Sequence, residues 1–286
     1  MTKRYLICDL DNTLYDWVSF FVPAFYAMVD VAVQIAKCDR EQLLDDFREV
    51  HRIAHNSEEP FALLHTRTIR NLYPQLSPRE LRKLFDPAFH AFNSARKRSL
   101  VLYPEVKETL DLLSRSKIKL IAHTESRLFG VLDRLRRLHL SDHFCRVYCR
   151  ERTSSLGVFD LEGDGWFDQF PMGKIVELSD HQAKPDPAVL LEICARENVA
   201  PSDAAYIGDS VAKDVVMAKK ANIFAVWAAY GSKHDQDLYQ SLVRVSHWTE
   251  EEVERERRLA REAIGVPADF VARSSFSEVV TAIGLS

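Results

Sequence analysis

The sequence has little of what marks several protein classes. It contains no long basic run and has a formal net charge of −4, so a broad electrostatic surface for nucleic acid is not expected. Its five cysteines are an odd number scattered along 286 residues, which favours reduced thiols over a disulfide framework. We see no internal repeat, low-complexity tract or secretory leader, and we therefore expect a cytoplasmic globular protein.

One apolar stretch, residues 17–36, is long enough to resemble a membrane span. It contains Pro23 and Asp30, and a charge in the middle of a membrane is costly. We therefore expect a buried amphipathic helix and no membrane partner. Hydrophobic residues make up 47% of the chain and charged residues 28%, a balance that can build a full globular core.

From residue 100 onward, strand-like and helix-like segments alternate. We expect strands at 118–123, 145–149, 204–208 and 223–227, helices at 105–115, 127–138, 187–198 and 211–221, and a last strand-helix pair at 269–283. Alternation of this kind is typical of an α/β fold with a doubly wound parallel sheet and helices on both faces. The apolar residues 4–8 predict one more strand of the same sheet.

Residues 15–99 follow a different pattern. Apolar residues recur at intervals of three and four, and the pattern breaks near Asp39, Pro60 and Ser77-Pro78. These spacings predict a domain of about four α-helices, inserted into an α/β core that comprises residues 1–14 and 100–286.

Two segments interrupt the α/β alternation, residues 152–182 and 232–265. The first is irregular, and part of it resembles a calcium loop. Pro171 stands where such a loop needs a bidentate Glu, so we expect a surface loop. In the second, a capping box opens a charged helix over 249–264, which we expect to be a solvated surface helix.

Polar side chains stand where the predicted strands end, and they are Asp9, Asp11, Thr124, Lys184, Asp209 and Asp214. Ligands of a parallel sheet bind at the carboxyl ends of its strands, so these side chains can converge there. Carboxylates that share a site repel one another, and Mg²⁺, which prefers oxygen ligands, would hold them together. Lys184 and Thr124 could neutralise phosphoryl oxygens while a carboxylate attacks phosphorus.

The order of these residues resembles the haloacid dehalogenase-like (HAD) superfamily, in its phosphatase branch. Asp9-Leu-Asp11-Asn-Thr13 is similar to the DxDxT signature, and Ile121-Ala-His-Thr124 to the apolar strand that ends in Ser or Thr. Lys184-Pro-Asp-Pro resembles the lysine motif, and Gly208-Asp209 with Asp214 the closing acidic motif. Glu125 departs from the pattern, because Asn is usual after the Ser or Thr.

The resemblance implies a role for each residue. Asp9 would be the nucleophile and Asp11 the general acid/base, while Thr124 and Lys184 would bind the transferring phosphate. The Asp9 carboxylate, the Asp11 carbonyl and Asp209 would ligate Mg²⁺, with Asp214 supporting that site. The inserted helices resemble the family's mobile cap, which excludes water and selects the substrate.

These expectations amount to a Mg²⁺-dependent phosphatase that acts on a small phosphorylated substrate through an aspartyl phosphate. A haloacid dehalogenase would share the core, but its chemistry needs neither Mg²⁺ nor an acid for the halide. A receiver-like switch would carry its phosphorylated aspartate mid-chain, after the acidic pair, with no long insert. A silent HAD-like binding protein would be favoured by an incomplete acidic set, and this set is complete. The sequence indicates neither the particular substrate nor the oligomeric state.

Further polar residues have weaker claims. His123 precedes Thr124 and is more typical of a packed polar residue than of a catalytic one. In the inserted helices, a substrate's anionic end could be recognised by Arg52, His65, Arg67 and Arg70, although a solvated helix face explains them as well.

Overall fold

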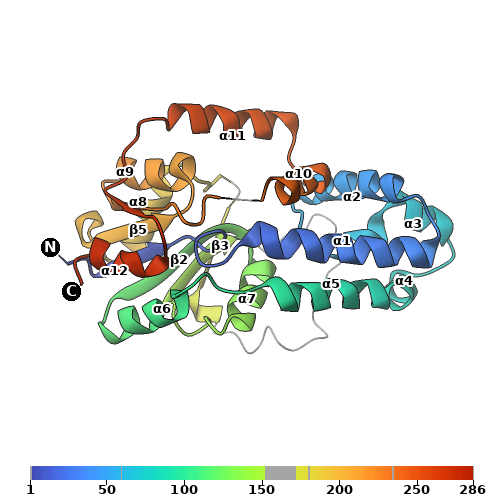
Figure 1. Cartoon of the computed structure of the whole chain (residues 1–286), viewed down its shortest axis with the longest axis horizontal. Coiled ribbons are helices and arrows are strands. Elements are labelled where there is room, and N and C mark those ends of the chain that lie inside the picture. Colours follow the sequence, from blue (N-terminus) through green and yellow to red (C-terminus); the bar gives the residue numbers. More distant parts are fainter. Residues whose placement is uncertain (1, 59, 152–171, 180, 234, 286) are drawn as a thin grey trace.

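The computed structural model describes residues 2–58, 60–151, 172–179, 181–233 and 235–285. Their strands form one seven-stranded sheet in the order β4-β3-β2-β1-β5-β6-β7, in which all neighbours are parallel (Figure 1). The strands are β1 (Tyr5–Cys8), β2 (Lys119–Arg127), β3 (Arg146–Arg150), β4 (Ile175–Leu178), β5 (Ala204–Gly208), β6 (Phe224–Ala228) and β7 (Phe270–Ala272). The predicted doubly wound α/β fold is confirmed.

Side chains of the central strand alternate between two hydrophobic clusters, one on each face of the sheet. Leu6 and Cys8 of β1 belong to one cluster, and Ile7 belongs to the other. The first face is covered by α6 (Val106–Arg115), α7 (Leu128–Arg137) and α12 (Val279–Ala282), the second by α8 (Pro187–Arg196) and α9 (Val216–Lys220). Because both faces of the sheet are buried, the central strands are continuous apolar runs, which is how they could be recognised in the sequence.

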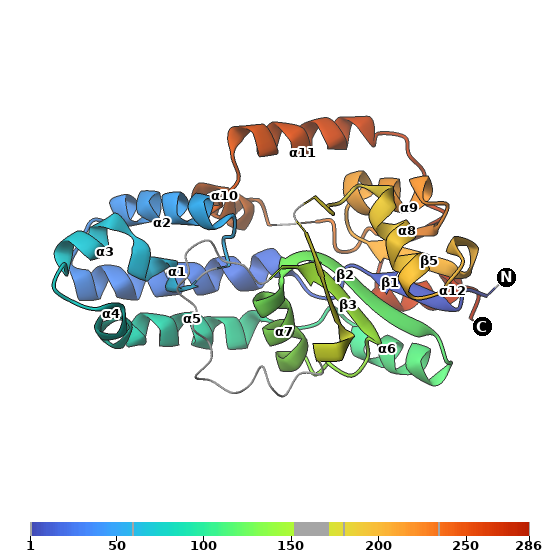
Figure 2. The ribbon, with the colours of Figure 1, turned by 180° about the vertical axis from the view of Figure 1, so that it is seen from behind.

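The helices of residues 15–99 lie beside the sheet as an elongated layer (Figures 1 and 2), which we call the cap. They are α1 (Trp17–Ala36), α2 (Arg40–Ala54), the 3₁₀ helix η1 (Pro60–His65), α3 (Arg67–Leu72), α4 (Pro78–Leu84) and α5 (Asp86–Ser99). The all-helical pattern was predicted, although the described residues contain five α-helices where about four were expected. The domain boundaries at residues 14/15 and 99/100 stay a prediction.

Helix α1 is long and apolar enough to cross a membrane by length and composition alone. In the structure it packs against α5, α2 and α10 (Gln236–Val245), and ten of its residues are buried. This packing favours the predicted reading of a core helix.

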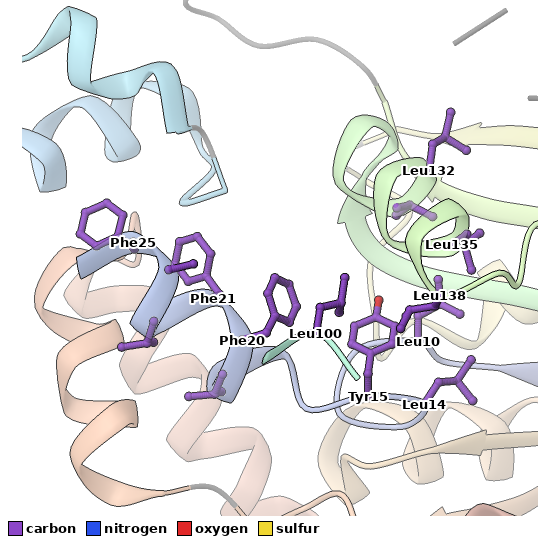
Figure 3. Packing of buried hydrophobic residues seen from close by; sticks show 14 of the residues in the cluster. Leu10, Leu14, Tyr15, Phe20, Phe21, Phe25, Leu100, Leu132, Leu135 and Leu138 are labelled. Carbon is purple, nitrogen blue, oxygen red and sulfur yellow. The ribbon is translucent and has the colours of Figure 1, made fainter. Parts of the chain in front are cut away.

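Hydrophobic packing continues from the cap into the core without a break (Figure 3). Phe20, Phe21 and Phe25 of α1 and Leu132 and Leu135 of α7 belong to the same cluster, and Figure 3 shows the Tyr15 and Leu10 side chains between the two groups. The structure therefore shows the cap packed against the core.

Two parts of the interrupting segments were predicted wrongly. Residues 175–178 are not irregular, because they form β4, which pairs with β3 at the edge of the sheet. Residues 236–245 form α10, an unpredicted helix that packs on α1 and α2 of the cap. The expected charged helix is present as α11 (Glu250–Glu262), with its capping box and no buried residue. The calcium-loop resemblance lies outside the described residues.

Candidate active site

The carboxyl ends of β1 and β5, which are neighbours in the sheet, bring Asp9 and Asp209 together. Asp9 follows β1 directly and is only 6% exposed, and its backbone N–H donates to the carbonyl of Ile207 at 2.9 Å. Its carboxylate accepts from Lys184 Nζ at 2.6 Å and from Thr13 Oγ1 at 3.3 Å. A buried carboxylate is thus held by one cation at the edge of the sheet predicted to bind ligands.

Lys184 also binds Asp214, whose Oδ1 accepts from Nζ at 2.8 Å. Burial opposes the charge of Lys184, but Asp214 and Asp9 outweigh it and raise its pKa. Asp214 lies on the π-helical turn η6 (Val211–Val215), and its Oδ2 accepts from the backbone N–H of Ser210 at 3.0 Å. A Cβ on Gly208 would lie 2.3 Å from Asp214 Cγ, so only glycine leaves room for this carboxylate.

A buried chain of hydrogen bonds links Asp214 to Tyr206 and His123. The Tyr206 hydroxyl lies 3.2 Å from Asp214 Oδ1 and 3.3 Å from His123 Nδ1. The hydroxyl has one proton, so if it donates to Asp214, Nδ1 of His123 must carry the hydrogen and donate to the phenol oxygen. Burial first, then Lys184, lowers the pKa of His123 well below its usual value, so the imidazole is neutral. The packed role favoured for His123 agrees with these contacts.

Three carboxylates gather around this pair of strand ends. Asp9, Asp209 and Asp214 place ligand oxygens within 4.8 Å of one another, and they form the acidic cluster of the described residues. Burial raises the pKa of Asp9 to about 7, against the pull of Lys184 and with a contribution from Asp214. Burial, Asp214 and Asp9 raise the pKa of Asp209 as well. One lysine does not balance three acids, so the site is suited to a cation with oxygen ligands.

Asp11 points into a different set of contacts. Its Oδ2 accepts from Ser126 Oγ at 2.6 Å and from Thr124 Oγ1 at 3.3 Å. Its Oδ1 lies 3.4 Å from Nη2 of Arg134, and no hydrogen bond of good geometry reaches that oxygen from the described residues. The structure therefore brings together all six predicted residues, in two groups around Asp9 and Asp11.

Glu125, where the chain departs from the family pattern, closes one side of the site. Its Oε1 accepts from the backbone N–H of Lys184 and from Arg150 Nη2, both at 3.3 Å, and its Oε2 accepts from Lys213 Nζ at 3.3 Å. Burial opposes its charge, but Lys213, Lys184 and Arg150 lower its pKa. Glu125 thus fixes the backbone that carries Lys184.

Contacts of the cap residues proposed for anion recognition lie within the cap for Arg67, His65 and Arg70. Arg67 lies 3.5 Å from Asp46, and the pKa of His65 is lowered by burial and by Arg70. Glu58 of the cap approaches Asp11 through Arg134. Sequence reasoning missed Glu58, Arg134 and Ser126, since none belongs to a motif that was recognised.

The protein is thus a doubly wound α/β protein with an acidic cluster at the carboxyl ends of its strands. A family model for haloacid dehalogenase-like hydrolases matches residues 3–222, and the chain belongs to this family. This confirms the resemblance inferred from the four motifs.

Two curated relatives are phosphatases by name. The chain is 25% identical over 239 residues to a glyceraldehyde 3-phosphate phosphatase of Methanopyrus kandleri, covering 82% of this chain and 87% of the relative. It is 40% identical over 57 residues to a phosphoglycolate phosphatase of Psychrobacter arcticus, covering 20% of this chain and 24% of that relative. The second match therefore spans about a quarter of the relative's length. These relatives support assignment of the chain as a phosphatase-type hydrolase.

A solved 2-haloacid dehalogenase from Pseudomonas syringae aligns with a TM-score of 0.56 at 21% identity, covering 99% of this chain and 98% of that one. A β-phosphoglucomutase-like structure from Thermotoga maritima aligns with a TM-score of 0.50 at 18% identity. Likeness at these identities shows the shared fold alone.

Proposed function

We propose that the protein is a Mg²⁺-dependent phosphomonoester hydrolase that acts on a small phosphorylated metabolite through an aspartyl phosphate on Asp9. The observation that carries the proposal is the buried Asp9 carboxylate, which lies 2.6 Å from Lys184 within an acidic cluster. The nucleophile, a cation for phosphate oxygens and a place for a metal thus occur together.

The residues present fit Mg²⁺. The carboxylates of Asp9 and Asp209 and the carbonyl of Asp11 would ligate the ion, and oxygen atoms are the ligands it prefers. Asp214 has its carboxylate engaged by Lys184, Tyr206 and Ser210, which favours a supporting role. When bound, the ion supplies positive charge that offsets the acidic cluster and the phosphoryl oxygens.

The chain's own residues account for the two chemical steps. In the first, a carboxylate oxygen of Asp9 bonds to phosphorus, the ester P–O bond breaks, and Asp11 gives its proton to the departing alkoxide. In the second, Asp11 takes a proton from water, which attacks phosphorus and breaks the bond to Asp9. Inorganic phosphate leaves, and the carboxylate of Asp9 and the acid form of Asp11 are regenerated.

The dehalogenase alternative fits these contacts less well. A halide leaves without a proton, so a dehalogenase has no use for an acid at Asp11. Here Ser126 and Thr124 hold Asp11 in the site, as a phosphatase needs in order to protonate an alkoxide. The curated relatives are named for their action on small phosphate esters, which favours a substrate of that class. We also propose that the protein is cytoplasmic.

The test is turnover of a panel of small phosphate esters and one aryl phosphate, with Mg²⁺ and with a chelator. We expect phosphate release that needs Mg²⁺ and disappears in Asp9→Asn, while Asp111→Asn on α6, with its 43% exposed side chain, stays active. Equal turnover in chelator would refute the metal assignment, and release of halide from 2-haloacids without phosphatase activity would favour the dehalogenase.

A further inference from the structure

The carboxylate of Glu58, a cap residue, reaches into the core beside Asp11 through Arg134. Glu58 lies between α2 and η1, and both of its oxygens accept from Arg134 Nη1 at 2.6 Å. Its Oε1 also accepts from the indole N–H of Trp17 at the start of α1. The Glu58 side chain is 14% exposed and the Arg134 side chain 3%, so this ion pair is shielded from solvent.

Arg134 of α7 joins that cap residue to the proposed acid/base. Its Nε donates to the Tyr15 hydroxyl at 2.9 Å, and its Nη2 faces Asp11 Oδ1 at 3.4 Å. Nη2 has no hydrogen-bond partner among the described residues. Burial opposes the guanidinium charge, but Asp11 and Glu58 outweigh it and raise the pKa of Arg134.

The helix that carries Arg134 has a glycine, Gly130, where it meets the Glu58 side chain. Gly130 lies one turn before Arg134 on α7, and a Cβ there would be 2.6 Å from Glu58 Oε2 and 3.0 Å from Arg134 Nη1. Glycine in a helix interior is less favourable than alanine. The space that this residue leaves is filled by the contact between cap and core.

The geometry points to Arg134 as a positioning residue for Asp11, held in place by Glu58 of the cap. This inference rests on the proposed function. A guanidinium is a rigid plane with its donors in a fixed fork, so bonds at Nη1 and Nε also fix Nη2. Nη2 lies 3.4 Å from the buried Oδ1 of Asp11, close enough to attract it without a hydrogen bond, so the guanidinium sets how this carboxylate is turned.

The arrangement links the cap to the acid/base step. If Glu58 is withdrawn, the guanidinium loses its hydrogen bonds at Nη1 and keeps the one from Nε to Tyr15. It can then rotate and pair with Asp11, the remaining neighbouring carboxylate. Bidentate pairing with arginine is strong and would occupy both oxygens of Asp11, which leaves neither for proton transfer. Asp11 is therefore available to the leaving group when the cap is packed as in this structure.

The test compares an alkyl phosphate with an aryl phosphate, because an aryl leaving group needs little protonation. We expect Glu58→Gln and Gly130→Ala to lower kcat for the alkyl ester by about 10-fold or more, within the range of general acid–base help. Their KM values and their turnover of the aryl ester should change by less than about threefold, as expected when only the acid/base step is affected. Arg137→Met, on the same helix and paired with Asp133 at 2.9 Å, is the matched control and should behave as wild type.

A double-mutant cycle separates positioning from structural damage. Arg134→Met alone should lower alkyl-ester kcat, and in an Asp11→Asn background it should lower it no further. Equal losses on both esters, a full additional loss in the Asp11→Asn background, or unchanged kcat in all Glu58 and Gly130 variants would overturn the inference. Absence of any phosphatase activity in wild type would instead refute the proposed function. Glu58→Gln keeps the shape of the side chain, so the test stands even if Arg134→Met does not fold.

Discussion

Replacing Lys184 by Met should destabilise the metal-free protein strongly. Lys184 Nζ lies 2.6 Å from Asp9 and 2.8 Å from Asp214, and the three side chains are 2% to 8% exposed. Removal of one partner from a buried ion pair leaves an uncompensated charge and typically costs 3–5 kcal/mol. Because two aspartates lose the same cation, we expect a loss in free energy of unfolding of about 4 kcal/mol.

Urea denaturation in the presence of a chelator measures that loss. Mg²⁺ should restore part of it, because an ion that binds only the folded state adds stability that grows with its concentration. Lys219→Met is the control, since Lys219 pairs with Asp269 at 2.6 Å but is 37% exposed. A partly exposed pair of this kind is worth about 1 kcal/mol or less. If Lys184→Met and Lys219→Met lost equal stability, the electrostatic account of the site would be refuted.

Three further outcomes are expected. Asp11→Asn should lower alkyl-phosphate turnover by about 10²–10⁴, with a smaller effect on an aryl ester in rapid-quench kinetics. Burial lowers the pKa of His51 to about 4, so between pH 6.5 and 4 the unfolded chain binds more protons and stability falls as pH drops. His51 contributes about 2 kcal/mol of this loss at pH 5, so in urea denaturation His51→Gln should lose about that much less stability than wild type. Gly208→Ala should lower kcat by about 10²-fold by displacing Asp214, whereas Gly173→Ala, with nothing within 4 Å of its Cβ, should not.

The site could be predicted where sequence motifs coincide with strand ends. Asp9 and Asp209 follow β1 and β5, and Thr124 lies on β2, so the parallel order of these neighbouring strands is enough to bring them together. Continuous apolar runs identified the central strands, and apolar residues at intervals of three and four identified the cap helices.

The missed features depend on packing between distant segments. Glu58 and Arg134 are 76 positions apart and meet only because the cap packs on α7, which no local pattern encodes. Helix α10 did carry a signal, since Leu238, Leu242 and Val245 recur at helical spacing and pack into the main hydrophobic cluster. Strand β4 lies at the edge of the sheet and buries one residue of its four, so it lacks the continuous apolar run that identified β1.

The central claim is that Asp9 carries the phosphoryl group. The direct measurement uses aryl phosphate labelled on phosphorus and the Asp11→Asn variant, in which hydrolysis of the intermediate should be slow, with Mg²⁺ and an acid quench. We predict a hydroxylamine-sensitive label on the peptide that contains Asp9, absent from the variant that also carries Asp9→Asn. A label on another residue, or undiminished phosphate release by Asp9→Asn alone, would contradict the account.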